Sequence, residues 1–278
     1  MQRASFNKIN VDAVLQQRLR RYYHLIPKRL IRWLERTICQ DGLNALLESN
    51  AGKTDDDFCH GVLSDLNVSY DVISRQPIST SDSRVVFACN HPLGALDGIA
   101  MIDFVSRRFN RPVKFVVNDL LTAIEPLKGV FLPINKHGKQ SRSSSSAIDE
   151  AFAGEDPIIV FPAGLVSRRQ GNEIRDLDWH KMFVNKCIKH KRNIIPTYFS
   201  GENSKFFYNF ARLRARTGLK FNIEMIYLPR EVFRCKDSNF SIITGEPIDF
   251  NSLRGGPYAS SEAESIKNRV YKLREFRK

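Results

Sequence analysis

Short apolar runs alternate with longer amphipathic stretches along most of this chain. The runs are bounded by polar or proline-containing turns and predict strands at 68–73, 85–89, 113–117, 130–134, 157–161 and 193–199. Apolar residues at helical spacing predict helices at 96–109, 120–124, 147–152, 179–191, 205–217 and 261–276. A polar loop at 135–145 and apolar runs at 221–227 and 240–243 complete the pattern. Strands that alternate with helices predict an α/β fold.

The first 60 residues follow a different pattern, with two apolar stripes separated by Pro27. Proline breaks or restarts a helix, so the pattern predicts two helices. Their apolar positions are Val11, Val14, Leu15, Leu19, Tyr22, Tyr23 and Ile26, then Leu30, Ile31, Trp33, Leu34, Thr37 and Ile38. We therefore predict an N-terminal amphipathic helical segment at residues 1–60, with an acidic loop at 55–57, and a main domain at residues 61–278.

Basic residues beside these stripes leave two interpretations open. Residues 1–37 contain nine basic and two acidic residues, an excess of +7. A basic amphipathic hairpin carrying Tyr22, Tyr23 and Trp33 suits the interface of an anionic membrane. A helical pair packed on the protein core, with a solvated basic face, shows the same period.

The whole chain is basic, with 43 lysines and arginines against 30 acidic residues and a net charge of +13. Such a surface attracts anions: nucleic acid, phospholipid head groups or acidic carriers. The sequence shows no nucleic-acid reading module, so we expect no nucleic-acid partner. No apolar run is long enough to span a membrane, and the N-terminus lacks the apolar core of a secretory signal. Five scattered cysteines without a CxxC pair favour reduced thiols in a cytoplasmic protein and argue against a zinc site.

One segment combines residues suited to acid–base chemistry. Asn90 and His91 directly follow the apolar run 85–89, and Asp97 lies at the start of the next helix. Open α/β sheets bind ligands at the carboxyl ends of their strands, where His91 is expected. An aspartate that folds back onto the imidazole fixes its tautomer, and the other ring nitrogen then accepts a proton from an attacking hydroxyl or amine. The alternative is a loop histidine beside an aspartate that only caps the helix.

Three further segments follow this one in order. They are residues 129–136 (Gly-Val-Phe-Leu-Pro-Ile-Asn-Lys), 161–168 (Phe-Pro-Ala-Gly-Leu-Val-Ser-Arg) and 194–197 (Ile-Ile-Pro-Thr). With Asn90, His91 and Asp97 as the first block, the chain resembles the glycerolipid acyltransferase superfamily, which includes bacterial 1-acylglycerol-3-phosphate acyltransferase. The resemblance covers about residues 68–250 and implies a glycerol-phosphate-acyltransferase-like mixed sheet flanked by helices.

The resemblance also implies transfer of an acyl group from an acyl-carrier-protein or coenzyme A thioester to a lyso-lipid, without a metal or other cofactor. His91 is then the general base and Asp97 its partner, while Asn90 or loop amides stabilise the oxyanion. The substrate-binding residues it implies are Asn90, Lys136, Pro162, Gly164, Arg168 and Arg169. The basic ones suit a carboxylate or the phosphopantetheine phosphate. The expected location is an anionic membrane surface, at the cytoplasmic face of the inner (cytoplasmic) membrane, with peripheral attachment.

Departures from the family pattern change the expected acceptor. Five residues separate His91 from Asp97 where the family usually has four, so Asp97 must reach back through a bulged turn. Ala163 replaces the family glutamate, and Val166 replaces the arginine that usually precedes Ser167. This form resembles a hemolysin-like bacterial branch that includes O-acyltransferases of ornithine and glycine lipids. Those enzymes esterify the hydroxyl of an N-(3-hydroxyacyl) amino acid, which is the acceptor we expect.

Two other functions stay open at this stage. One is a conventional lysophosphatidate acyltransferase of phospholipid synthesis with altered motifs. The other is a non-enzymatic basic protein that binds membrane or nucleic acid, whose affinity for either would survive the loss of His91. Acyl transfer that depends on His91 separates the enzymatic functions from the non-enzymatic one.

Overall fold

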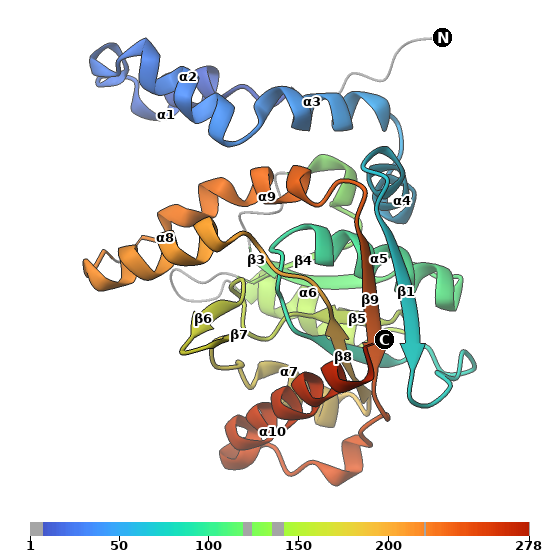
Figure 1. Ribbon diagram of the computed structural model, residues 1–278. Helices are drawn as coiled ribbons and strands as arrows, with labels where there is room; N and C mark the ends of the chain where they lie inside the picture. The colour runs from blue at the N-terminus through green and yellow to red at the C-terminus, as the bar shows by residue number, and fades with distance from the viewer. Residues whose placement is uncertain (1–7, 119–123, 135–141, 220, 278) are drawn as a thin grey trace.

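A seven-stranded sheet organises the computed structural model, which describes residues 8–118, 124–134, 142–219 and 221–277 (Figure 1). Its strands are β1 (Ser69–Ser74), β2 (Val85–Cys89), β3 (Lys114–Asn118), β4 (Phe131–Ile134), β5 (Ile158–Val160), β8 (Asn193–Phe199) and β9 (Asn239–Thr244). The spatial order is β1-β9-β8-β2-β5-β3-β4, and neighbouring strands are parallel except β8 and β9. A separate hairpin pairs β6 (Arg168–Gln170) with β7 (Glu173–Arg175). The expected mixed α/β sheet is confirmed.

Helices cover both faces of this sheet. The α-helices of the described residues are α1 (Val11–Leu19), α2 (Lys28–Thr37), α3 (Gln40–Ser49), α4 (Asp55–Asp65), α5 (Leu96–Phe109), α6 (Arg142–Ala153), α7 (Met182–Lys189), α8 (Lys205–Arg216), α9 (Leu228–Arg234) and α10 (Ala259–Lys272). Short 3-10 turns include η4 (Ile223–Tyr227) after α8 and η6 (Gly256–Tyr258) before α10. In Figure 1, α1, α2 and α3 form a layer of their own above α8 and α9.

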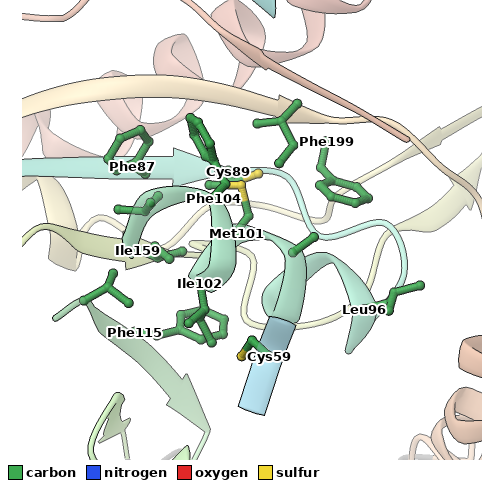
Figure 2. Packing of buried hydrophobic residues seen from close by; sticks show 14 of the residues in the cluster. Cys59, Phe87, Cys89, Leu96, Met101, Ile102, Phe104, Phe115, Ile159 and Phe199 are labelled. Carbon is green, nitrogen blue, oxygen red and sulfur yellow. The ribbon is translucent and has the colours of Figure 1, made fainter. Parts of the chain in front are cut away.

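Strand β2 lies at the centre of the core and is buried at every position. Phe87 and Cys89 belong to the apolar cluster that includes α4 and α5, part of which Figure 2 shows. Val86 and Ala88 point the other way, into the cluster that includes α6, α7 and α10. A strand buried on both faces explains the unbroken apolar run that predicted it.

Most of the predicted elements are present, and the differences have local reasons. Residues 55–57 are the first turn of α4 and not a loop, because carboxylates are favourable at the N-terminus of a helix. The next turns of α4 bury Phe58, Cys59 and Val62, so the predicted domain boundary at residue 60 falls inside a helix of the core. Residues 142–145 belong to α6, and residues 223–227 form η4. The predicted helix at 120–124 lies outside the described residues except for residue 124, and so does the 135–141 part of the predicted loop at 135–145.

The two predicted N-terminal helices are present as α1 and α2, with Pro27 directly before α2. Five of the thirteen stripe residues are exposed, namely Val14, Leu19, Tyr22, Leu30 and Trp33. Val11, Ile31 and Thr37 are buried, and the other five are half-buried. Packing on the protein core therefore accounts for only part of the stripe. Within the described part of the chain, no helix has both the length and the hydrophobicity needed to cross a bilayer.

Arg192 is fully buried and binds the end of α6. Its guanidinium donates hydrogen bonds to the carbonyl oxygens of Ala151, Phe152, Gly154 and Asp156. Burial lowers the pKa of Arg192 to about 10, which leaves the side chain charged at neutral pH. A cation at a helix C-terminus satisfies carbonyls that lack intrahelical partners and faces the negative end of the helix dipole. This one side chain therefore connects the segment leading into β5 with the start of β8.

We expect Arg192→Met to lower the free energy of unfolding by about 3–5 kcal/mol, because several buried carbonyls lose their donors. Arg192→Lys should recover only part of this loss, since an ammonium lacks the planar fork of a guanidinium. Urea unfolding followed by circular dichroism measures both changes. The matched control is the exposed Arg269→Met on α10, which should stay within about 0.5 kcal/mol of wild type. Equal stability of Arg192→Met and wild type would show that the hydrogen bonds of Arg192 do not stabilise the fold.

Candidate active site

Three loops meet at the carboxyl edge of the sheet. Strands β5, β2 and β8 are parallel neighbours, so their carboxyl ends lie side by side. The backbone amide of Ser167, after β5, donates to the carbonyl oxygen of His91, after β2, at 2.8 Å. The side-chain amide of Asn203, after β8, donates to the carbonyl oxygen of Pro92 at 3.0 Å. The first and third sequence blocks thus form one site.

The imidazole of His91 is paired with the carboxylate of Asp97. Nδ1 of His91 lies 2.9 Å from Oδ2 of Asp97. An ionised carboxylate can only accept a hydrogen bond, so Nδ1 carries the proton and Nε2 keeps its lone pair. This is the tautomer that a general base needs for accepting a proton at Nε2.

A left-handed turn at Gly94 accommodates the extra residue between His91 and Asp97. Gly94 has a φ of +89°, a conformation that costs glycine little. A Cβ at this position would lie 2.7 Å from Cγ2 of Val166, so a larger residue would also collide with the neighbouring loop. The turn brings the amides of Leu93 and Gly94 to Oδ2 of Asp97, at 2.9 and 3.3 Å. The bulged turn expected from the spacing is therefore present.

Asp97 is fully buried, yet its surroundings favour the charged form. Burial acts to raise the pKa of this carboxyl, but the His91 ring and the amides of Leu93 and Gly94 outweigh it, and the pKa lies below its ordinary value. The amide of Gly98 donates to the other oxygen, Oδ1, at 2.9 Å. Fixed donors thus hold both oxygens, and the carboxylate in turn holds the imidazole.

The ring of Phe161 supports the imidazole from one side. The ring centroids of His91 and Phe161 are 4.3 Å apart, with an angle of 25° between the ring planes. Phe161 directly follows β5 and packs edge-on against Phe115 at 5.1 Å. The side chain of His91 remains 15% exposed. The imidazole therefore rests on the core and can still be reached from outside.

A second buried carboxylate, Asp176, joins the loops around His91. Its Oδ1 accepts hydrogen bonds from the amide of His91 at 3.2 Å and from the hydroxyl of Ser167 at 2.6 Å. Its Oδ2 accepts one from the indole of Trp179 at 2.9 Å. Burial raises the pKa of Asp176, and these bonds offset only part of the rise. The sequence did not reveal this residue, because nothing in the local pattern separates Asp176 from Asp178.

Asn90 joins two strands, and this corrects its expected role at the oxyanion. Its side-chain carbonyl accepts a hydrogen bond from the amide of Phe199 at 2.7 Å, and its Nδ2 donates to the Phe199 carbonyl at 3.0 Å. The side chain is almost completely buried. Asn90 therefore locks the end of β2 to the end of β8 and fixes the backbone that carries His91.

Arg168 also differs from its expected role, because a buried carboxylate already binds it. One guanidinium nitrogen of Arg168 lies 2.8 Å from Oε1 of Glu224, which is fully buried. Arg214 of α8 donates to the same carboxylate, at 2.9 and 3.1 Å. Burial lowers the pKa of Arg168 despite this partner. Two cations share one anion, so the cluster keeps one positive charge while neither arginine is a free ligand.

Glu224 itself was missed from the sequence, although a signal was available. It is the one acidic residue between Glu202 and Glu231, in a segment with many arginines and lysines. An isolated acid among cations is a good candidate for an internal ion-pair partner. Glu224 lies 56 residues from Arg168 in the chain, so only the fold identifies the pair.

The remaining expected binding residues lie around the turn after β5. Pro162 is buried, and its carbonyl accepts a hydrogen bond from the amide of His180 at 3.0 Å. Gly164 has a φ of +59°, which forms the turn toward the Ser167 contact. Arg169 is exposed on β6, and Lys136 lies outside the described residues. Contact of Pro162, Gly164, Lys136 and Arg169 with substrate stays a prediction.

A family profile, two curated relatives and one solved structure resemble this chain. A family profile described as Acyltransferase matches residues 13–277. The chain is 37% identical over 265 residues to a lyso-glycine lipid O-acyltransferase of Bacteroides thetaiotaomicron, covering 95% of this chain and 97% of that protein. It is 36% identical over 265 residues to a protein of the same name from Phocaeicola vulgatus, covering 95% of each. The 1-acyl-sn-glycerophosphate acyltransferase structure from Thermotoga maritima aligns with a TM-score of 0.46 and 12% identity, over 95% of this chain and 91% of that one.

We expect Asp97→Asn to destabilise the protein by about 2–4 kcal/mol at pH 7, because one oxygen that accepts hydrogen bonds becomes a donor. The pKa of Asp97 is lowered in the folded state, so its charged form contributes stability above its unfolded pKa of about 4 and loses it as the pH falls through the folded pKa. The difference between variant and wild type should therefore shrink below about pH 4. Urea unfolding from pH 7 to pH 3 measures it, and a difference that grows on acidification would contradict the assignment.

Proposed function

This chain belongs to the acyltransferase family, and on that premise we propose that it moves a fatty acyl group from an acyl thioester to the hydroxyl of a lyso-amino-acid lipid of the glycine type. The observation that carries the proposal is identity of 36–37% over almost the full length of two proteins named lyso-glycine lipid O-acyltransferase. The His91–Asp97 pair supplies the chemistry that such a transfer needs. A non-enzymatic binding protein, the least specific of the earlier alternatives, is excluded by the family.

The transfer follows from the geometry of the pair. Nε2 of His91 accepts the proton of the acceptor hydroxyl as its oxygen attacks the thioester carbonyl carbon. Asp97 stabilises the imidazolium that forms. The tetrahedral intermediate then expels the thiol sulfur, the C–S bond breaks, and the imidazolium returns the proton to sulfur. The products are an ester and a free thiol, with no covalent acyl-enzyme.

The structure supports the catalytic pair more directly than it supports the choice of acceptor. Ala163 removes the family glutamate, which argued against a phosphate head group. Glu224 nevertheless supplies a carboxylate that orders Arg168 from another part of the chain. The glycine-type acceptor therefore rests on the relatives, and lysophosphatidate remains the competing acceptor that the experiment below tests.

We further propose that the donor is a thioester of acyl carrier protein or coenzyme A, with no metal or other cofactor. Both carry a phosphopantetheine phosphate, for which the exposed Arg169 and Lys136 are candidate ligands. The exposed apolar residues of α1 and α2 and the basic excess of residues 1–37 support binding to an anionic membrane surface. We propose peripheral attachment at the cytoplasmic face of the inner membrane.

We expect His91→Ala to lower turnover by at least about 100-fold, because the acceptor hydroxyl loses its base. Turnover is measured as lyso-glycine lipid converted to product, by mass spectrometry, with each thioester as donor. A matched control is His180→Ala, which removes an exposed ring in the loop that follows Asp176. Unchanged circular dichroism would show that the His91 variant is folded. Turnover near that of wild type would remove His91 from the mechanism.

The acceptor is tested by competition. Lyso-glycine lipid and lysophosphatidic acid at equal concentration are presented to wild-type protein with one thioester donor. We expect at least about tenfold preference for the amino-acid lipid. This is the discrimination expected of a binding site that pairs with the carboxylate of one head group and not with the phosphate of the other. Faster acylation of lysophosphatidic acid would overturn the proposed acceptor and leave the family and the catalytic pair standing.

A further inference from the structure

Helix α8 and the turn that follows it carry an apolar surface that none of the other described elements covers. Its members are Phe206, Leu213, Leu219, Phe221 and Ile223, which we call the α8 patch. Phe221 is 78% exposed and Leu213 is 58% exposed. Single exposed apolar residues are ordinary, but a group of five within eighteen positions of one segment marks an interaction site.

The charge around the patch indicates what covers it. Residues 205–223 contain five basic residues and no acidic one. Arg212 and Arg216 are exposed on the helix beside Leu213. The first acid that follows, Glu224, is fully buried and bound to two arginines. An apolar surface beside exposed arginines, in a segment without an acidic residue, fits anionic lipid head groups above an apolar layer.

The base of the patch is rigid and aromatic. The rings of Phe206 and Phe210 stack at 5.8 Å, and both pack edge-on against Tyr227, at 5.0 and 5.5 Å. The ion pairs of Glu224 with Arg214 and Arg168 hold α8 to η4 and to β6. A preformed surface loses little conformational freedom on binding, which favours shallow insertion without refolding.

Helix α8 extends to the same side of the molecule as the N-terminal helices. In Figure 1, the α1 and α2 end of the N-terminal layer and the free end of α8 lie on one side of the sheet. Helix α3, in the same layer as α1 and α2, packs closely on α9. Gly42 of α3 lies so near the ring of Phe233 that a Cβ at this position would be 2.7 Å from it. Two apolar, basic surfaces on one side of a molecule can contact one bilayer together.

We propose that the α8 patch is a second membrane-binding element, which inserts into the head-group layer of an anionic bilayer beside α1 and α2. The inference rests on the membrane binding that the proposed function assigns to α1 and α2. It adds α8 and the turn after it as a second segment that contacts the membrane. It also has a consequence for the site: β6, held to α8 through Arg168 and Glu224, begins one residue after Ser167, which contacts His91. The membrane would then hold the loop at the catalytic histidine at a set height above the lipid.

The test uses the full chain carrying Phe221→Ser and Leu213→Ser together. Binding is measured by co-sedimentation with vesicles of phosphatidylcholine and phosphatidylglycerol, and with phosphatidylcholine alone, in the absence of an acyl donor. We expect the double variant to bind the anionic vesicles at least about tenfold more weakly, since two large apolar side chains no longer enter the membrane. The matched control, Tyr258→Ser, removes an exposed aromatic residue of η6 and should bind like wild type. Equal binding by the double variant and wild type would overturn the proposal.

A second measurement does not depend on lost affinity. Phe221→Trp adds an indole at the most exposed position of the patch. Vesicles containing brominated lipid should quench the added emission, whereas a patch that faces water or another protein would leave it unquenched. Because neither experiment uses acyl transfer, failure of the glycine-lipid acceptor would not affect them. A patch whose emission stays unquenched while lyso-glycine lipid is acylated would overturn this inference alone.

Discussion

The structure of the loop at the carboxyl edge of the sheet depends on hydrogen bonds to one fully buried carboxylate. Asp97 has no access to water, so its charge is compatible with the fold only while the imidazole and three backbone amides face it. Two of those amides, from Leu93 and Gly94, belong to a turn that closes only with glycine at position 94, and the third, from Gly98, belongs to the first turn of α5. The electrostatic requirement therefore shapes the backbone, and the backbone places His91. Catalytic geometry and local stability are here the same interaction.

The elements that the sequence predicts best are those that are mostly buried. β2, α5 and β8 match the expected bounds because β2 is buried at every position and α5 and β8 at most positions, so a long apolar run marks each of them. Helix α4 was not predicted, because the three adjacent aspartates at its start are typical of a loop as well as of a first helical turn. α9 was missed because it follows η4 without a polar break.

The same distinction applies to the site. His91 and Asp97 are six positions apart, so that their pairing is a local event that spacing can suggest. Asp176 meets the His91 amide across 85 positions, and Glu224 meets Arg168 across 56. A charged residue whose partner is distant in the sequence cannot be recognised from the residues around it. For that reason the sequence suggests Arg168 as a substrate ligand without indicating that Glu224 already binds it.

The stack of Phe161 on His91 has a thermodynamic consequence. A histidine side chain that moves among rotamers before substrate arrives would lose that freedom at each catalytic cycle, and the loss would add to the activation barrier. Here the phenyl ring restricts one face and Asp97 restricts Nδ1. The entropy of the imidazole is therefore lost once, when the chain folds, and every later encounter with a hydroxyl begins from an already ordered base.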